Sequence, residues 1–447
     1  MKRTYLMLSM AVLLSGGVAL SSCTHEDELP QVPPVDGGNE PSEPNKPDEP
    51  VDPSDPVDPL AGIRLDVPKG GFTTARCRVL PIAPQVTDGK AYNFSWSQGD
   101  SLLATTQQLD FISLEVGRHT LTLQVSEQGS SALLGSRTVA VDVTTETTPY
   151  SPYVASVLDY RPAPGQFINE LPPYEKGDTQ QTMNRKASQR IANNARSLVS
   201  LGGFGGYIVC SFDHTIVNVP GEYDFKVLGN AFFSEMDQNA DPDREGGNSE
   251  PGIVMVAYDR NGNGQPDDDE WYELAGSEYG KDTTTKHYTI RYYRPDPNKE
   301  PVPAPDNEKG WNLDAEYIRW TDGAGGEGFL PKNSFHKQSY YPEWIAQNEL
   351  DFEGTCLPRN GKDESLAGDG SYWVLYAYDW GYADNMPNND PRAGLKIEWA
   401  VDRDGQPVHL PGIDFVKIYT GVNQCNGRIG ETSTEVMGVN DLHLLKR

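Results

Sequence analysis

The run from Asp259 to Glu270 carries the donor pattern of a calcium-binding loop. It satisfies D-x-[DN]-x-[DN]-G-x5-E at every fixed position. Calcium takes hard oxygen ligands, and the glycine at the sixth position permits the sharp turn of the loop. An acidic turn that binds no metal is the alternative. The ligands expected for a structural Ca2+ are Asp259, Asn261, Asn263, the carbonyl of Gln265, and Glu270.

The segments on either side of this loop read as strands. Residues 253–258 are apolar and rich in β-branched types, and Trp271 to Leu274 reads as a second strand. Pro266, inside the loop, cannot donate a backbone hydrogen bond. We therefore expect the loop to connect two strands, and not the two helices of an EF-hand.

A second candidate site lies in the segment 380–389, which places aromatic rings beside amides and carboxylates. Aromatic faces bind apolar surfaces, whereas amides both donate and accept hydrogen bonds. This mixture suits a ligand with broad apolar faces and a polar rim, and carbohydrate recognition uses the same mixture. Aromatics in a core and asparagines in turns are the alternative. The residues expected to contact a ligand are Trp380, Tyr382 and Asn385.

Signatures of catalysis are weak in this chain. His214 follows Asp213, but no G-x-S-x-G motif accompanies the pair, so we expect a structural histidine. The glycine-rich segment 200–206 offers no G-x-G-x-x-G that opens onto a helix, which favours close backbone packing over a nucleotide site. A glycosidase pair stays open, because its two carboxylates are defined by their separation in space. We expect a binding protein and not an enzyme.

The first residues have the organisation of a secretory signal that ends at a cysteine. Lys2 and Arg3 precede an apolar stretch shorter than the ~20 residues that span a bilayer. The Leu-Ser-Ser-Cys sequence ending at Cys23 resembles a bacterial lipobox, in which residues 1–22 are removed and the cysteine is acylated, which anchors the protein to a membrane. The alternative is an ordinary secreted protein.

An acidic run, residues 24–28, follows this cysteine. It resembles the export tag that sends lipoproteins of Bacteroidota to the outer face of the outer membrane. A plain solvated charge run is the alternative. We therefore expect a lipid-anchored protein exposed on the cell surface.

Residues 23–60 have the composition of an acidic, proline-rich stalk. Prolines recur at every third position from Pro41 to Pro59, which matches the three-residue turn of polyproline II. Such a segment cannot bury enough apolar surface to build a core. The whole chain has a net charge of −28, which repels phosphate backbones. We therefore expect no nucleic-acid partner.

Residues 61–146 are expected to form a small β-sandwich. Strand-like runs recur at short intervals, and residues 120–125 alternate polar with apolar side chains. The segment Tyr92 to Trp96, together with Gly117 to Leu123, resembles PKD-type immunoglobulin-like modules. In such modules the tryptophan packs in the core, and the module mostly acts as a spacer. The resemblance implies the same of Trp96 and of this segment.

Residues 147–447 are expected to form a larger, jelly-roll-like β-sandwich with one helix. Apolar residues at three- and four-residue spacing predict the helix over 181–201. Short apolar runs between turn residues predict the strands. These strands are 207–212, 223–228, 253–258, 289–293, 372–376, 395–399 and 415–419.

Four cysteines follow the anchor, and their spacing contains no C-x-x-C pair. A zinc site or a redox pair is therefore not expected. Four cysteines allow three disulfide connectivities, and buried free thiols are the alternative. The residues concerned are Cys77, Cys210, Cys356 and Cys425.

Several long motifs after residue 148 resemble a family of surface lipoproteins of gut Bacteroidota. Members are associated with TonB-dependent uptake of corrinoids. The resemblance implies capture of a vitamin B12-type cobamide for an outer-membrane transporter. A glycan-binding lipoprotein of a polysaccharide-utilisation system and a calcium-dependent glycosidase are the alternatives. The motifs include Phe212 to His214, Glu250 to Val256, Ser371 to Tyr376, Asp379 to Asn385, and Gly412 to Tyr419.

Overall fold

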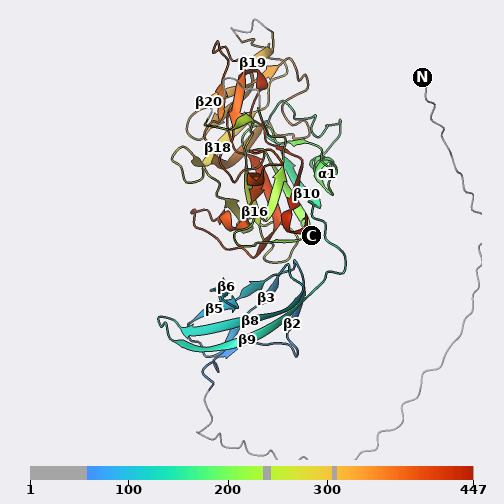
Figure 1. Cartoon of the computed structure of the whole chain (residues 1–447). Helices are drawn as coiled ribbons and strands as arrows, with labels where there is room; N and C mark the ends of the chain where they lie inside the picture. The colour runs from blue at the N-terminus through green and yellow to red at the C-terminus, as the bar shows by residue number, and fades with distance from the viewer. Residues whose placement is uncertain (1–57, 235–242, 305–309, 446–447) are drawn as a thin grey trace, which may run out of the picture. The chain divides into compact units, whose positions relative to one another are not determined.

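The computed structural model describes residues 58–234, 243–304 and 310–445 (Figure 1). The signal segment, Cys23 and most of the stalk lie outside the described residues. The described chain consists mainly of strands in several sheets, with one helix of more than two turns. The expected all-β architecture of packed sheets is therefore confirmed.

The first part of the described chain is built around a five-stranded sheet in the order β2-β9-β8-β5-β6. The long strands β8 and β9 lie side by side in Figure 1. Two short ladders join β1 to β4 and β3 to β7. The strands are β1 (Ile63–Arg64), β2 (Phe72–Ala75), β3 (Leu80–Ile82), β4 (Gln85–Val86), β5 (Tyr92–Gln98), β6 (Ser101–Ala104), β7 (Leu109–Phe111), β8 (Gly117–Glu127) and β9 (Leu133–Thr144).

Alternation along β8 buries one face of this five-stranded sheet. Leu121, Leu123 and Val125 are buried, and the residues between them are partly or fully exposed. Trp96 of β5 is fully buried in the same cluster, as expected for the core of such a module. Each large apolar side chain buried in this way contributes roughly 1.5–3 kcal/mol.

The second part of the chain is organised around a six-stranded sheet in the order β10-β12-β26-β16-β17-β25, antiparallel throughout. Each neighbouring pair therefore places directly opposed residues on the same face of the sheet. Its strands are β10 (Ser156–Arg161), β12 (Tyr207–Val217), β16 (Gly252–Ala257), β17 (Trp271–Leu274), β25 (Ala400–Val401) and β26 (Gly412–Thr420).

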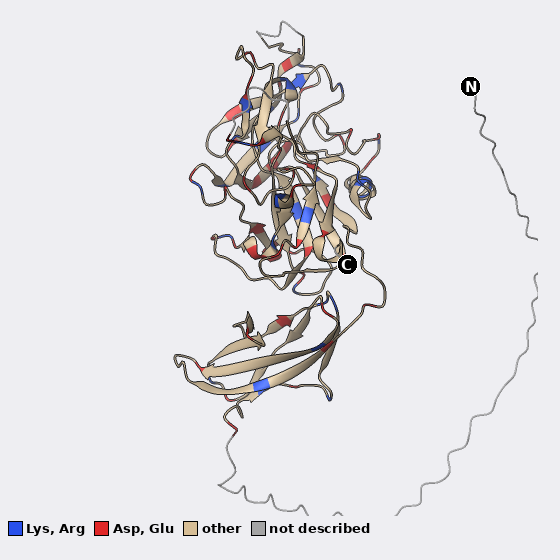
Figure 2. Cartoon of the chain, in the orientation of Figure 1, with Lys and Arg blue, Asp and Glu red and all other residues tan. Residues whose placement is uncertain are grey.

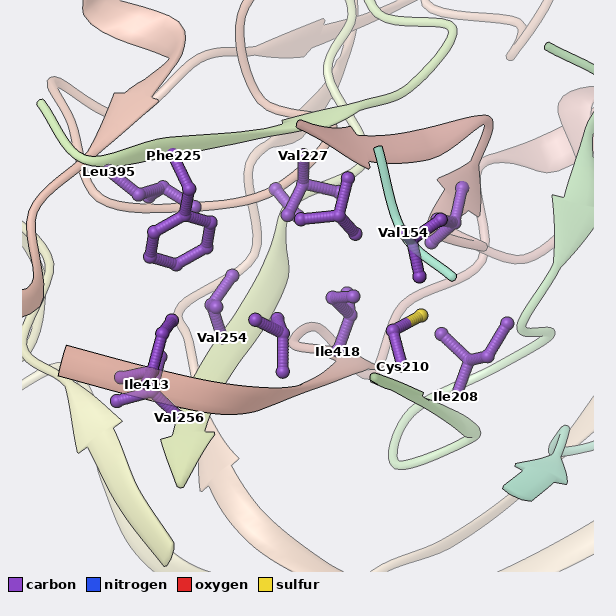
Figure 3. Close-up of a cluster of buried hydrophobic side chains, with 14 of the residues drawn as sticks. Val154, Ile208, Cys210, Phe225, Val227, Val254, Val256, Leu395, Ile413 and Ile418 are labelled. Atoms are coloured by element: carbon purple, nitrogen blue, oxygen red, sulfur yellow. The ribbon is translucent and has the colours of Figure 1, made fainter. Parts of the chain in front are cut away.

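One face of the six-stranded sheet packs against a three-stranded sheet and a helix. Figure 3 shows Phe225, Val227 and Leu395 facing side chains of the larger sheet, among them Val254 and Ile418. These residues form one buried cluster, to which the helix also contributes. The covering elements are β24 (Gly394–Leu395), β13 (Phe225–Leu228), β28 (Gly438–Asp441) and α1 (Gln180–Ile191).

The opposite face of the six-stranded sheet is partly covered by a four-stranded sheet. Ile253 and Tyr419 share a second buried cluster with Ile290 and Tyr292 of that sheet. The six-stranded sheet is thus the central layer of this part of the chain. The covering strands, in sheet order, are β20 (Glu327–Asn333), β19 (Asn312–Asp322), β18 (Thr285–Tyr293) and β21 (Glu349–Cys356).

Short elements complete the second part. A four-stranded sheet has the order β14-β15-β23-β22, and β11 pairs with β27. These elements are β11 (Val199–Ser200), β14 (Phe232–Phe233), β15 (Gly246–Asn248), β22 (Gly361–Asp363), β23 (Trp373–Tyr376), β27 (Glu435–Val436), α2 (Leu442–Leu445), and the 3-10 turns η1 (Asp268–Glu270), η2 (Pro391–Ala393), η3 (Ile397–Trp399) and η4 (Gly427–Ile429).

Two predicted elements need correction. The helix ends at Ile191 and not at residue 201, because Ala192 is extended (φ −76°, ψ 156°) and Asn193 and Asn194 follow with left-handed angles of φ 52° and 64°. The strand predicted over 395–399 is limited to β24, and η3 occupies its second half. Most of the four-stranded covering sheet, including all of β19, β20 and β21, was not anticipated.

The glycine-rich segment serves backbone packing, as expected. A Cβ on Gly202 would lie 2.0 Å from the Ala163 carbonyl oxygen, and one on Gly206 would lie 1.9 Å from the Leu201 carbonyl oxygen. Only glycine permits the backbones to approach this closely. The segment is therefore a close crossing of backbones.

All four described cysteines are free thiols, so none of the three disulfide connectivities is formed. Among the described residues, no helix is long and apolar enough to cross a bilayer. Figure 2 shows acidic and basic residues interspersed, while most of the strand length carries neither.

Candidate functional site

A cavity of about 620 Å³ opens on the face of the six-stranded sheet that carries the covering sheet. Its floor comes from β16, β17, β25 and β26, and its sides come from β18, β21 and the turn after β25. The side chains on which its chemistry depends are Met255, Trp271, Glu273, Tyr279, Lys286 and Lys417.

Strand register places the floor residues in one row. Met255 is directly opposite both Lys417 of β26 and Glu273 of β17, and Glu273 is directly opposite Val401. Directly opposed residues share a face, as do residues two apart on one strand. Trp271 therefore lies on the same face as Glu273, and the cavity floor is a continuous strip across four strands.

Glu273 and Lys286 form an incompletely satisfied charged pair in the cavity. Lys286 Nζ lies 4.0 Å from Glu273 Oε1, which is too far for a hydrogen bond. Both atoms are buried, and neither has a hydrogen-bond partner within the described part of the chain. The other carboxylate oxygen, Oε2, accepts a hydrogen bond of 2.6 Å from the Thr355 hydroxyl. The Lys286 ammonium and Glu273 Oε1 thus lie close to each other, and each lacks a hydrogen-bond partner.

The environment of this pair weakens both charges. Burial lowers the pKa of Lys286 to about 8, although the Glu273 carboxylate opposes the change. Burial raises the pKa of Glu273, against the Thr355 hydrogen bond and the charge of Lys286. Burial also lowers the pKa of Lys417. These shifts follow because a low-dielectric surrounding disfavours the ionised form.

The walls of the cavity are aromatic and its floor is closely packed. Trp271 and Tyr279 line it, and the Lys286 ammonium lies over the Tyr279 ring. The buried Tyr419 hydroxyl accepts a 2.8 Å hydrogen bond from the Thr355 amide. A Cβ on Gly354 would lie 2.7 Å from the Tyr419 ring, so only glycine fits there. The strand that holds Thr355 against Glu273 is therefore fixed by this contact.

The three residues expected to contact a ligand do not line this cavity. Trp380 is 36% exposed and packs on Trp399, with ring centroids 4.6 Å apart. Tyr382 is buried, and its hydroxyl accepts a hydrogen bond from the Glu278 amide. Asn385 is buried and bonds the backbone of one tyrosine twice, through its own Oδ1 and Nδ2. Tyr382 and Asn385 thus have structural roles, and Trp380 alone presents surface to a ligand.

The expected calcium loop connects two strands, as predicted, and its side chains fold inward. Asp259 accepts hydrogen bonds from the amides of Asn263 and Gly264, at 3.0 and 2.8 Å. The two carboxylate oxygens of Glu270 accept from the amides of Arg260 and Asp267. Gly264 has φ 74°, which the turn requires.

The donor set of this loop fits a calcium ion. Carboxylates keep lone pairs beyond those used by the backbone, and asparagine oxygens and a carbonyl supply the remaining hard donors. The five predicted residues would hold the ion: Asp259, Asn261, Asn263, Gln265 and Glu270.

A buried carboxylate cluster escaped the sequence analysis. Glu250, Asp384 and Glu435 are buried, with ligand oxygens within 4.8 Å of one another. Burial, reinforced by Glu250, raises the pKa of Asp384 to about 8, and burial raises the pKa of Glu435 well above its usual range. Backbone amides donate to Glu250 and Asp384, and serine hydroxyls donate to Glu435. Burial therefore favours the protonated, uncharged form of these carboxyl groups.

His214 is structural, as expected. It is buried, and its ring nitrogens lie 2.7 Å from Asp213 and 2.8 Å from Asp441. Burial lowers its pKa, but the hydrogen bonds to Asp441 and Asp213 outweigh burial and raise the pKa overall. The histidine thus joins two segments of the chain far apart in sequence.

The cavity residues left faint signals in the sequence. Lys417 is the basic residue of a mainly apolar strand that also contains Asp414, and Trp271 and Glu273 alternate on the strand that follows the candidate calcium loop. Lys286 and Thr355 belong to the covering sheet, of which only residues 289–293 were anticipated. No local pattern places those two beside Glu273.

Comparison with known proteins identifies no family for the chain. No protein-family model matches it, and no curated protein matches it. Similarity to solved structures is weak. Fibronectin(III)-like modules of Clostridium thermocellum CbhA are 9% identical over 61% of this chain and 90% of that chain, with a TM-score of 0.17.

Two further solved structures concern carbohydrate binding. Carbohydrate-binding modules of the β-sandwich superfamily are 11% identical over 82% of this chain and 94% of that chain, with a TM-score of 0.13. A Bacteroides ovatus protein, SGBP-B of a mixed-linkage glucan utilization locus, was solved with a heptasaccharide. It is 12% identical over 80% of this chain and 99% of that chain, with a TM-score of 0.16. Similarity this low does not identify a ligand.

Proposed function

We propose that this chain is a surface-anchored binding protein that captures a glycan in the cavity of the six-stranded sheet, without chemical turnover. The observation that carries the proposal is the pair of buried, unsatisfied atoms, Glu273 Oε1 and Lys286 Nζ, 4.0 Å apart. Buried polar atoms are rarely left without partners, so such a pair points to a ligand group that completes it.

A hydroxyl group fits this pair. It accepts a hydrogen bond from an ammonium and donates one to a carboxylate. An oxygen about 2.8 Å from each atom can lie between two atoms 4.0 Å apart once the Lys286 side chain shifts to admit it, because both atoms are buried in this structure. Water offers the same two bonds, so the aromatic wall is needed to favour a sugar over solvent.

That wall supplies apolar surface for a sugar ring. Trp271 and Tyr279 line the cavity beside the charged pair. The C–H face of a sugar can pack on such rings while its hydroxyls bind the polar atoms. The cavity volume of about 620 Å³ falls within the usual range for small-ligand sites, ~300–1,000 Å³.

Calcium has a supporting role in this proposal. The candidate calcium loop ends at Glu270, and the next residue is Trp271. An ion bound by Glu270 would hold the start of β17 and thereby the aromatic wall. The expected effect is stabilisation of the site and not direct contact with the ligand.

The proposal also places the protein on the cell surface. Acylation at Cys23 would anchor the chain to the outer membrane, and the stalk 23–60 would hold the folded part away from the lipid. Residues 61–146 would act as a spacer. A glycan-binding protein on the cell surface can then retain a ligand for a TonB-dependent transporter.

Capture of a cobamide is the second candidate. It is favoured by the motifs at Ser371 to Tyr376, Asp379 to Asn385 and Gly412 to Tyr419, which resemble corrinoid-uptake lipoproteins. The partly exposed ring of Trp380, which contacts Trp399 at a tilted angle of 45°, offers an apolar surface for such a ligand. This candidate would use a different part of the surface from the glycan site.

An oligosaccharide array, followed by calorimetry with each hit and with cyanocobalamin, tests the two candidates. The proposal predicts binding of at least one oligosaccharide, which is recovered unchanged after prolonged incubation. Cleaved oligosaccharide would convert the binding protein into a glycosidase. Binding of cyanocobalamin alone would replace the glycan by the corrinoid.

A further inference from the structure

A lysine that forms no ion pair among the described residues lies on the floor of the cavity. Lys417 is directly opposite Val209 on one side and Met255 on the other. Phe415 and Tyr419 flank it on the same face of β26. All four neighbours are apolar or aromatic, so the strand register provides the ammonium with no counter-ion.

The Lys417 ammonium contacts an aromatic ring instead. Nζ lies 4.3 Å from the centroid of the Tyr207 ring. In the described chain it makes no hydrogen bond and has no carboxylate within 4.0 Å. Asp159 and Asp268 are the acidic groups that influence it. Asp159 is already engaged, because it accepts from the Tyr207 hydroxyl at 2.9 Å and pairs with Arg161 at 3.2 Å.

A half-buried ammonium without an anion is unfavourable. Removing the charge from water costs free energy that a cation–π contact offsets only in part. Lys417 lines the cavity, so an anion that enters there can pair with its ammonium. Charge-assisted hydrogen bonds of this kind are about twice as strong as neutral ones.

We propose that the cavity binds an acidic oligosaccharide and that Lys417 recognises the carboxylate of one of its sugars. The inference rests on the proposed glycan site and names the class of glycan. Lys417 and Glu273 are separated by two strand spacings, about 9.6 Å. The carboxylate and the hydroxyl held by Glu273 and Lys286 therefore belong to different positions of one oligosaccharide.

The rim of the cavity limits how much negative charge the ligand carries. Glu353, Asp402 and Asp404 line the cavity together with Arg403 and His287, and His287 lies 3.5 Å from Glu353. A polymer with a carboxylate on every sugar would meet these acidic groups. The arrangement favours a glycan in which a uronic acid alternates with, or branches from, neutral sugars.

The test is calorimetry of the mature chain with hexuronate-containing oligosaccharides, each beside its carboxyl-reduced derivative. Reduction replaces the carboxylate by an alcohol and leaves the rest of the sugar unchanged. The variants are Lys417→Met, which suits the apolar surroundings, Lys417→Gln in case the first does not fold, and Lys176→Met as a control at an exposed lysine away from the cavity.

The expected result is that wild type and Lys176→Met bind an acidic oligosaccharide at least ~10-fold more tightly than its reduced form. In the Lys417 variants this ratio falls to about one. A ratio near one in the wild type, or a ratio that survives Lys417→Met, overturns the inference and leaves the proposed glycan site standing. Absence of binding by every acidic, reduced and neutral oligosaccharide overturns both.

Discussion

Replacing Glu435 by glutamine should flatten the pH dependence of folding stability. Glu435 lies in the buried cluster with Glu250 and Asp384, and its Oε1 accepts hydrogen bonds from the hydroxyls of Ser200 and Ser433. Burial, followed by the charges of Glu250 and Asp384, raises its pKa well above the usual range. The folded state therefore retains a proton that the unfolded chain loses near pH ~4.3.

This retained proton determines whether folding stability rises or falls with pH. A carboxyl whose pKa is raised in the folded state stabilises the fold at low pH, and that stability is lost as pH rises toward the folded pKa. The pKa of Asp384, raised to about 8 by burial and by Glu250, defines the upper end of the window. One retained proton changes the free energy of unfolding by about 1.4 kcal/mol per pH unit, which gives about 4 kcal/mol between pH ~5 and ~8.

Glutamine keeps the shape of Glu435 and its hydrogen-bond acceptor, but it removes one titrating group. Glu435→Gln is therefore expected to lose less stability than the wild type between pH ~5 and ~8. The slope of its free energy of unfolding against pH should be smaller by up to the contribution of one titrating proton, about 1.4 kcal/mol per pH unit. His214 titrates in the same direction in both proteins, because its pKa is raised as well, so the difference isolates the cluster.

Urea unfolding at a series of pH values measures this effect, with Glu300→Gln as a control at an exposed glutamate. The control should follow the wild-type curve. Parallel curves for wild type and Glu435→Gln, or a wild-type stability that rises from pH ~5 to ~8, would refute the reasoning about retained protons.

Three further predictions concern the calcium loop, the cavity wall and the anchor. Calcium should raise the melting temperature of metal-free protein, because an ion at a hundredfold excess over Kd adds about 2.7 kcal/mol to the free energy of unfolding. Glu270→Gln should reduce this gain. Identical melting curves with calcium and with chelator would count against calcium binding by the loop. Thr355→Val removes the donor to Glu273 Oε2 and should cost about 1–3 kcal/mol in chemical unfolding, so an unchanged midpoint would show that the bond contributes nothing. Cys23→Ala should release the protein from the membrane fraction, and persistent membrane partition would argue against acylation.

Much of the fold is encoded in local sequence patterns. The alternation around Leu121 and the apolar strand at Val254 predicted strands that the structure contains, because period-two burial requires only a sheet with one buried face. The helix was placed correctly at its start, but its end was missed. Apolar spacing continues past Ile191, but Ala192 leaves the helix in an extended conformation and two asparagines with left-handed backbone angles follow it.

The site was less accessible to sequence reasoning than the fold. The candidate calcium loop could be identified because all its expected donors lie within one short segment. Glu273, Lys286 and Lys417 come from three strands, and only register and the covering sheet bring them to one cavity. The loop around Asn385 misled for the opposite reason. Its polar residues have the chemistry of a ligand site, but the fold uses Asn385 and Tyr382 internally.

If the glycan binds in the cavity on the six-stranded sheet, Trp271→Ala and Trp380→Ala should differ in affinity. Calorimetric titrations of both variants with the oligosaccharide that binds best in an array measure this difference. Truncating an aromatic anchor typically costs 2 kcal/mol or more. We expect Trp271→Ala to weaken binding at least about thirtyfold and Trp380→Ala to bind like the wild type. Full affinity in Trp271→Ala, together with a loss of affinity in Trp380→Ala, would contradict binding in the cavity and place the site at the exposed Trp380 surface.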